Sequence, residues 1–402
     1  MRIVFVNLHT NEFLVKTASK YIFKQSVAIK HRYLLDYLLD NKDFEVCSYI
    51  NKNGTSIASS LPGPLMALLR ACRFLESKWV LKKNGLSGKI KVLKHLSDIQ
   101  PNDIVMIYQL YAAKSPEIGD VDAFKVVSML HFHGTQSNSD AIRACKPELL
   151  IGESNLKKYS KIFQRYYSWY DKDILVHPFV FEKRFQNKMS FSQRKNCVFS
   201  TGTITYKKHP EFLTVYGDPC DQPMRKYVKE HQKELKGMID CYNSDYSEDA
   251  NKNMEVKASD NKLIRLIKSV YYKFFASQQK SYYSFNMVEK FNEYKMCMIG
   301  EEILGVPGIG AVEGMACGCA YLGENVGYYE DYGMQEGVHY IGYDGTPEGL
   351  KSIVAFYQRP EHQSKLKQIA ENGCEFVHEY FKGETVARNL IEALMETKNS
   401  KQ

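Results

Sequence analysis

The sequence has no apolar run of the roughly 18 residues that a membrane-spanning helix needs, which excludes an integral helical membrane protein. Its first apolar run, Ile3–Val6, is also too short for the hydrophobic part of a secretory signal peptide. We therefore expect a cytoplasmic protein.

Closely spaced cysteines are also lacking. The ten cysteines are spread along the chain, without the dense spacing of a disulfide-rich secreted domain. The closest pair, Cys317 and Cys319, has one intervening residue, whereas zinc motifs have about two to four. We interpret both as small core residues, and we expect free thiols and no bound metal.

The composition is otherwise that of an ordinary globular protein, with 44% hydrophobic and 25% charged residues. A length of 402 residues exceeds what one core usually organises, so two domains are expected. The net charge of +8 is modest for this length, and the aromatic residues follow no RNA-binding motif. We expect no nucleic-acid partner.

Short apolar runs alternate with segments of helical period, which is the pattern of a parallel sheet covered by helices. We predict strands at 3–6, 44–49, 104–110, 126–132, 149–152, 174–176, 197–200, 238–241, 296–299 and 319–322. Ser154 is placed to cap a helix that runs to Phe163. The pattern predicts an α/β protein of two Rossmann-like domains.

The domain boundary is placed at a polar connector, residues 182–196. We assign residues 1–185 to the first domain and 195–380 to the second, and we expect 381–402 to form a helix that crosses back to the first domain.

Residues 305–319 read GVPGIGAVEGMACGC and place small residues where a strand gives way to a helix. Backbone can approach a ligand closely at glycine, and the N–H groups at a helix start favour a diphosphate. Gly308 and Gly310 are the candidates for this contact, while Glu313, expected in the first helical turn, can accept hydrogen bonds from ribose hydroxyls. The alternative is that the glycines only allow close packing of the helix, with Glu313 a favourable charge near its start.

This segment resembles the donor-binding segment of GT-B fold glycosyltransferases, especially those of family 4. In that family a glycine-rich loop precedes a Glu-Ala-Met-Ala-Cys-Gly helix, and residues 313–318 here read EGMACG. The resemblance implies that Glu313 binds the donor ribose. It also implies that Gly308, Ile309 and Gly310 contact the diphosphate and the transferred sugar.

The strand and turn at 197–203 resemble the first strand of the family's second domain, so Gly202 and Thr203 are assigned to the donor site. A basic pair after that turn neutralises donor phosphate in the family. Lys208 stands where the lysine is expected, but Thr203 occupies the place of the arginine.

A second departure lies eight residues before Glu313, where family 4 enzymes carry another glutamate and this chain has Gly305. Glu301 and Glu302 are the nearby candidates to replace it. The departure leaves open a nucleotide-sugar-binding protein without catalysis. A further alternative is an NAD(P)-dependent oxidoreductase, but eight residues separate Ile299 from the first glycine of the GxGxxE pattern, which argues against a dinucleotide fingerprint.

Two histidines are candidate catalytic residues. His133 follows an apolar strand at the carboxyl edge of the sheet and resembles the family's histidine near the transferred sugar; the alternative is a local hydrogen bond. His9 ends the first strand, where a histidine of inverting relatives acts as general base. Asp171 and Asp173 match a metal-binding Asp-x-Asp pattern, which we interpret as a solvated turn.

Residues 64–95 combine leucines and aromatic residues with eight Lys or Arg residues and a single acidic residue, Glu76. Such a segment suits contact with an anionic membrane and a lipid-linked glycan acceptor, although an ordinary surface helix has the same pattern.

The sequence therefore predicts a metal-independent GT-B glycosyltransferase without cofactor. The first domain would bind a glycan or lipid-linked acceptor, the second the nucleotide-sugar donor. A role in polysaccharide or glycoconjugate assembly is implied by the family alone.

Overall fold

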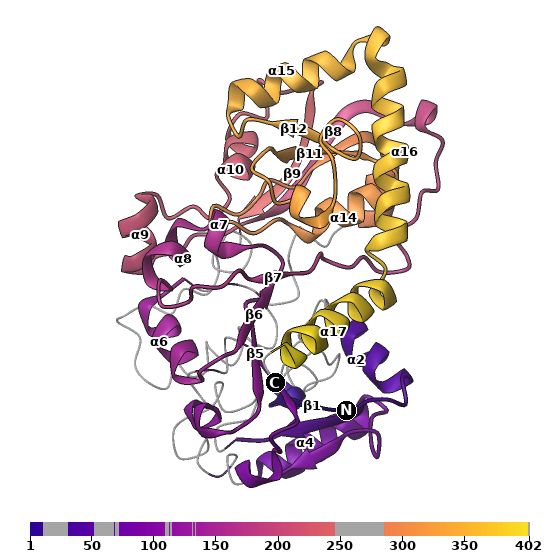
Figure 1. Ribbon diagram of the computed structural model, residues 1–402. Helices are drawn as coiled ribbons and strands as arrows, with labels where there is room; N and C mark the ends of the chain where they lie inside the picture. Colours follow the sequence, from indigo (N-terminus) through magenta and orange to yellow (C-terminus); the bar gives the residue numbers. More distant parts are fainter. Residues whose placement is uncertain are drawn as a thin grey trace.

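The computed structural model describes residues 1–10, 31–51, 68, 72–108, 112, 115–130, 132, 134–245 and 285–400. Its described helices and strands form two α/β units, which lie one above the other in Figure 1, each built around a parallel sheet. The predicted α/β class with two Rossmann-like domains is confirmed.

The first unit contains seven described strands in the order β3-β2-β1-β4-β5-β6-β7, and all neighbours are parallel. The strands are β1 (Arg2–Val6), β2 (Glu45–Tyr49), β3 (Lys91–Leu93), β4 (Ile104–Tyr108), β5 (Phe124–Ser128), β6 (Leu149–Gly152) and β7 (Leu175–Val176). Apolar clusters cover both faces of this sheet, which is why every residue of β4 and β5 is buried. Its helices are α2 (Arg32–Asp40), α4 (Arg73–Lys83), α6 (Gln136–Ala144), α7 (Leu156–Tyr159) and α8 (Lys161–Tyr166).

The second unit contains five described strands in the order β12-β11-β10-β8-β9, again all parallel. The strands are β8 (Lys195–Ile204), β9 (Ile239–Asp245), β10 (Tyr294–Met298), β11 (Ala320–Glu324) and β12 (Ile341–Tyr343). The helices are α9 (Pro210–Tyr216), α10 (Pro223–Glu230), α13 (Met287–Glu293), α14 (Ile309–Ala316), α15 (Pro347–Gln358) and α16 (Gln363–Tyr380). Clusters on the two faces make up its core.

The last helix, α17 (Gly383–Asn399), leaves the second unit and lies beside α2 of the first (Figure 1). Ala387, Leu390, Ile391 and Leu394 belong to the same apolar cluster as Ile3 of β1. The C-terminal helix therefore forms part of the core of the first unit.

The predicted helix from Ser154 to Phe163 is wrong in its form. Two short helices occupy this region, and the hydroxyl of Ser160 caps the second by accepting from the N–H of Phe163. Ser154 instead donates its hydroxyl to the carbonyl oxygen of Gly305 in the second unit. Its side chain therefore joins the two units rather than capping a helix.

All ten cysteines lie in the described part of the chain and are free thiols. Among the described residues, no cluster of His, Cys, Asp and Glu side chains is arranged to hold a metal ion. The described helices include none with the length and apolar character needed to cross a bilayer.

Candidate functional site

A loop of residues 299–308 leads from β10 to α14 at the carboxyl edge of the second sheet. Helix α14 begins at Ile309, with Gly308 at the N-cap and no side-chain cap. A Cβ atom on Gly308 or Gly310 would lie 2.7 Å from a side-chain atom of Ile299. Close packing thus explains the two glycines, and the first turn still carries uncapped N–H groups of the kind that bind anions.

Arg225, on α10, lies at the carboxyl ends of β8 and β10. Its Nε donates to the carbonyl oxygens of Ile299 and Gly300, and its Nη1 donates to that of Thr203 at 2.7 Å. The residue is 7% exposed. Its Nη2 has no partner among the described residues and lies 3.3 Å from the position that a Cβ on Gly308 would take. The guanidinium is held by three carbonyls with one edge directed at the start of α14.

Two glycines make room for this arginine. Gly202 has a φ of 153°, and a Cβ there would lie 2.7 Å from the Nε of Arg225. Gly300 has a φ of 64°, and a Cβ there would lie 3.1 Å from the Cγ of Arg225. Sequence reasoning missed Arg225. The signal that could have indicated it is the pair of glycines at neighbouring strand ends, since a glycine in or next to a strand often marks the close approach of another group.

The predicted basic contact after β8 is arranged differently from the family pattern. Lys208 is exposed, and Thr203 contributes its backbone carbonyl to Arg225. The neighbouring Lys207 pairs with the buried Asp221 at 3.2 Å. The buried cation nearest to the glycine-rich loop is therefore Arg225, supplied by another helix.

Glu301 is buried at the carboxyl end of β10. Its Oε1 accepts from the hydroxyl of Tyr321 at 2.8 Å, from the hydroxyl of Tyr329, and from the backbone N–H of Glu324 at 3.3 Å. Burial, together with the charge of Glu301, raises the pKa of both tyrosines well above the usual range. One oxygen of Glu301 thus binds β11 and the segment that follows it, while its Oε2 is buried and has no hydrogen-bond partner among the described residues.

The same network predicts a pH-dependent stability. Burial, followed by the charge of Glu301, raises the pKa of Glu324 to about 8. The folded protein therefore binds the proton of the Glu324 carboxyl more tightly than the unfolded chain does. The stability that comes from keeping Glu324 protonated is complete at acidic pH and is lost as pH rises through about 8. We expect the melting temperature of the wild type to fall between about pH 6.5 and 8.5 more steeply than that of Glu324→Gln.

The pH range is chosen to exclude a second carboxylate. Burial, followed by the charge of Glu302, raises the pKa of Asp221 to about 6. The change in stability caused by ionisation of Asp221 is therefore complete near pH 6, below the range used for Glu324. If the melting temperatures of the wild type and Glu324→Gln changed equally with pH across this range, the pKa of Glu324 would not be raised in the folded protein.

Glu302 lies at the base of a small hairpin in the loop. Its N–H donates to the carbonyl oxygen of Val306 at 3.0 Å, and the N–H of Ile303 donates to that of Asp221 at 2.8 Å. Glu302 is partly exposed beside Asp221. Of the two predicted substitutes for the family glutamate, Glu302 is therefore the one whose side chain reaches solvent, since Glu301 is buried.

The tip of the 299–308 loop packs against the first unit. Leu304 is 1% exposed and belongs to an apolar cluster of that unit. Gly305 has a φ of 86°, and a Cβ there would lie 3.0 Å from the carbonyl carbon of Tyr159. A glutamate at position 305 does not fit this arrangement without a shift of the backbone.

Glu313 lies in the second turn of α14, not in the first, because the helix already begins at Ile309. Its side chain is partly buried. The carboxylate therefore belongs to the turn that follows the uncapped N–H groups.

Of the two predicted histidines, His9 is completely buried in the short helix η1 (Leu8–Thr10), directly after β1. His133 lies outside the described residues. Asp171 and Asp173 are both exposed, and Asp173 accepts a hydrogen bond from Asn155 at 3.1 Å.

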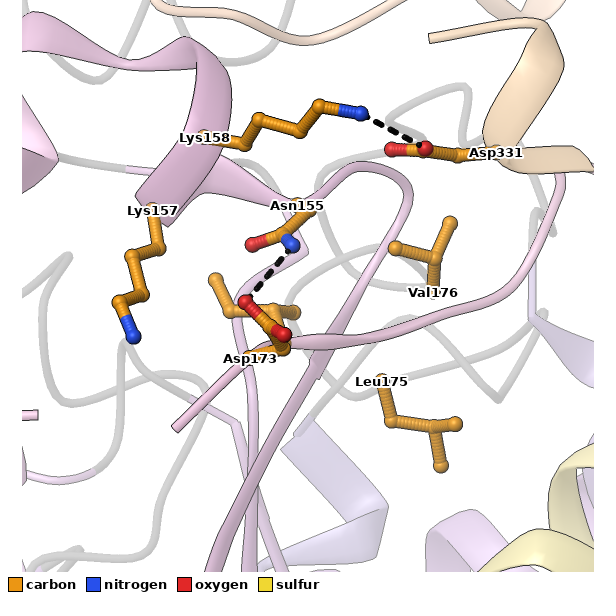
Figure 2. Close-up of a pocket in the computed structure, with 8 residues that line it drawn as sticks. Asn155, Lys157, Lys158, Asp173, Leu175, Val176 and Asp331 are labelled. Carbon is orange, nitrogen blue, oxygen red and sulfur yellow. Dashed lines mark hydrogen bonds and ion pairs between the residues drawn. The ribbon is translucent and has the colours of Figure 1, made fainter. Parts of the chain in front are cut away.

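A pocket of about 780 Å³ lies where the two units meet, and Figure 2 shows that Lys158 of α7 reaches across to Asp331 there. Their charged atoms are 3.2 Å apart, and the hydroxyl of Tyr159 lies 2.8 Å from Asp331 Oδ2 and 2.8 Å from the carbonyl oxygen of Gly327. The lining residues are Asn155, Lys157, Lys158, Asp173, Ile174, Leu175, Val176 and Asp331. None of them is a predicted donor residue.

No protein-family model matches the chain, and no curated protein matches it. Among solved structures, the chain is similar to HepE (Alr3699) of Anabaena in complex with UDP and glucose, with a TM-score of 0.53 and 12% identity over 98% of this chain and 100% of that one. The structure of HepE in complex with UDP-glucose has a TM-score of 0.51 and 12% identity, again over 98% of this chain and 100% of that one. The N-terminal domain of trehalose-6-phosphate phosphatase from Candida albicans has a TM-score of 0.50 and 11% identity, over 98% of this chain and 97% of that one. These similarities, with the two parallel sheets, show that the fold is GT-B.

Proposed function

We propose that this protein is a glycosyltransferase that moves a sugar from a nucleotide-sugar donor to an acceptor hydroxyl. The proposal is carried by Arg225, a buried cation whose Nη2 is directed at the uncapped start of α14. A fixed guanidinium and a helix start both favour phosphate oxygens, and here they converge. The resemblance of residues 313–318 to family 4 supports the proposal, as does the fold shared with HepE, which was solved with UDP and with UDP-glucose.

In the proposed donor complex, Arg225 and the first N–H groups of α14 bind the diphosphate. They stabilise the negative charge that develops on it as the bond to the sugar breaks. Glu313 binds the ribose from the second turn of the helix, and Lys208 contributes a second, more exposed cation. Glu302 takes the place of the absent family glutamate near the transferred sugar.

The first unit binds the acceptor in this proposal. His9 and His133 remain the candidates for acting on the acceptor hydroxyl or the transferred sugar. The proposed step uses neither metal nor cofactor, since the arginine and the helix start supply the charge stabilisation. Assembly of a polysaccharide or glycoconjugate in the cytoplasm is the role that the family resemblance favours.

The donor is identified by thermal unfolding in the presence of UDP, GDP, CMP, NAD and NADP and the common sugar conjugates. We expect one nucleotide sugar to raise the melting temperature, because a ligand that binds only the folded state stabilises it. Glu313→Ala should bind that ligand roughly 10- to 100-fold more weakly, because a charged hydrogen bond contributes about 1.5–3 kcal/mol.

Glu348→Ala is the matched control, since Glu348 is an exposed glutamate in the first turn of α15 in the same unit. It should leave nucleotide-sugar binding unchanged. Stabilisation by NAD or NADP alone would replace the proposal with the oxidoreductase alternative. Tight binding of a nucleotide sugar with neither transfer nor hydrolysis would support the binding protein without catalysis.

A further inference from the structure

Helix α4 presents an unusual surface at the end of the first unit that lies farthest from the second unit in Figure 1. Leu75 on this helix is 67% exposed, and Leu68 just before it is 63% exposed. Every other large hydrophobic side chain of the described residues is at most 45% exposed. Single exposed apolar residues are common, but these two leucines stand apart from the rest of the described surface.

The exposed side of α4 is also strongly basic. Leu75, Lys78 and Lys82 are all exposed and follow each other at helical spacing, whereas Val80 and Leu81 are buried in the core. Lys78 and Lys82 have no acidic partner among the described residues. The helix therefore carries an apolar side chain within a cationic stripe, on the side opposite its core contacts.

Neighbouring residues extend this positive surface. Lys83, Lys89, Lys91 and Lys94 are exposed, and Lys91 pairs with Glu45 at 3.6 Å. The Nζ of Lys94 lies 5.6 Å from the ring centre of Phe74 on α4, so the segment after the helix folds back toward its first turn. Glu76 is the only acidic residue between 72 and 94.

We propose that this α4 surface, formed by Leu75, Lys78, Lys82 and Lys83 of the helix with Lys94 beside its first turn, docks on an anionic lipid bilayer. Lysines gain from the surface potential of anionic headgroups, and exposed leucines gain by entering the acyl boundary. Charge alone would suit a nucleic acid equally well, but a nucleic acid offers no apolar phase for Leu75. With α4 on the membrane, the junction of the two units and the proposed donor site lie away from the bilayer (Figure 1).

The proposal is tested with the full chain by co-sedimentation with vesicles of phosphatidylcholine alone or with about one-third phosphatidylglycerol. We expect binding to the anionic vesicles only, and a loss of at least about 10-fold for Lys78→Glu/Lys82→Glu, because each cation near the surface contributes to partitioning. Leu75→Ser should bind several-fold more weakly even at low salt. All these side chains are exposed, so the folded state should be retained, which circular dichroism checks.

The matched control is Lys365→Glu/Lys367→Glu, which reverses two exposed lysines of α16 in the other unit. This variant should bind like the wild type. Equal losses for both double variants would show that only net charge matters and would overturn the proposal. It would also be overturned by an absence of vesicle binding, or by binding to a single-stranded RNA probe that responds to Lys78→Glu/Lys82→Glu but not to Leu75→Ser.

Discussion

Arg225→Met is expected to weaken nucleotide-sugar binding by roughly 10- to 100-fold and to lower kcat/KM by at least as much. The variant removes the cation that is directed at the start of α14, and a charged hydrogen bond contributes about 1.5–3 kcal/mol. The affinity and kcat/KM of Arg225→Lys should lie between those of the wild type and Arg225→Met, because lysine keeps the charge but not the planar fork of donors. Calorimetric titration with the donor and steady-state kinetics measure the two effects.

Arg225 also holds backbone carbonyls at the ends of β8 and β10, so its loss should lower stability. Titrations therefore have to be made where circular dichroism shows the variant folded. Lys226→Met is the matched control, since Lys226 lies on the same helix and pairs with Asp218 at 3.6 Å. If folded Arg225→Met bound the donor like Lys226→Met, the diphosphate would have to be bound elsewhere.

Gly305→Glu, which introduces the glutamate that the family 4 pattern has at this position, is expected to reduce both stability and activity. The backbone at Gly305 has a φ of 86°, and an added Cβ would lie 3.0 Å from the carbonyl carbon of Tyr159. Strain of this kind and an unpaired buried carboxylate together should destabilise the protein by about 3 kcal/mol or more. Denaturant unfolding measures the loss, and donor turnover should fall because the loop no longer sits against the first unit.

Two alanine variants separate the contributions. Gly337 has a φ of 72°, and a Cβ added there would meet no neighbouring atom within 4 Å, so Gly337→Ala reports backbone strain alone. Gly305→Ala adds the contact with Tyr159 and should be the more destabilised of the two. Wild-type stability with increased turnover in Gly305→Glu would mean that the loop rearranges, and that the missing glutamate does limit catalysis.

The fold was predictable because its central strands are buried on both faces. β4 and β6 are continuous apolar runs, and such runs give a clear signal even without alternation. β3 and β12 were missed, since each is an edge strand of only three residues. Ser154 was misassigned because a serine before an apolar segment has the same local signal whether it caps a helix or bonds to a distant carbonyl.

The candidate site was only partly predictable. The glycine-rich loop has a local pattern, but Arg225 acquires its place only when α10 packs beside two strand ends that are distant in sequence. The helix start near Glu313 was misplaced because glycines in and before a helix weaken the propensity signal that marks its boundary. Contacts between the two units, such as that of Ser154 with Gly305, leave no sequence pattern at all.

The path of α17 has a consequence for how the molecule is made. Ile3 in β1 and Leu394 in α17 belong to one apolar cluster, so the core of the first unit joins segments that lie far apart in the sequence. During vectorial synthesis the second unit can assemble while α17 is still inside the ribosome, whereas the first cannot close its core until α17 has emerged. The unit translated first is thus the one completed last, and until then the surface that receives α17 is available to chaperones.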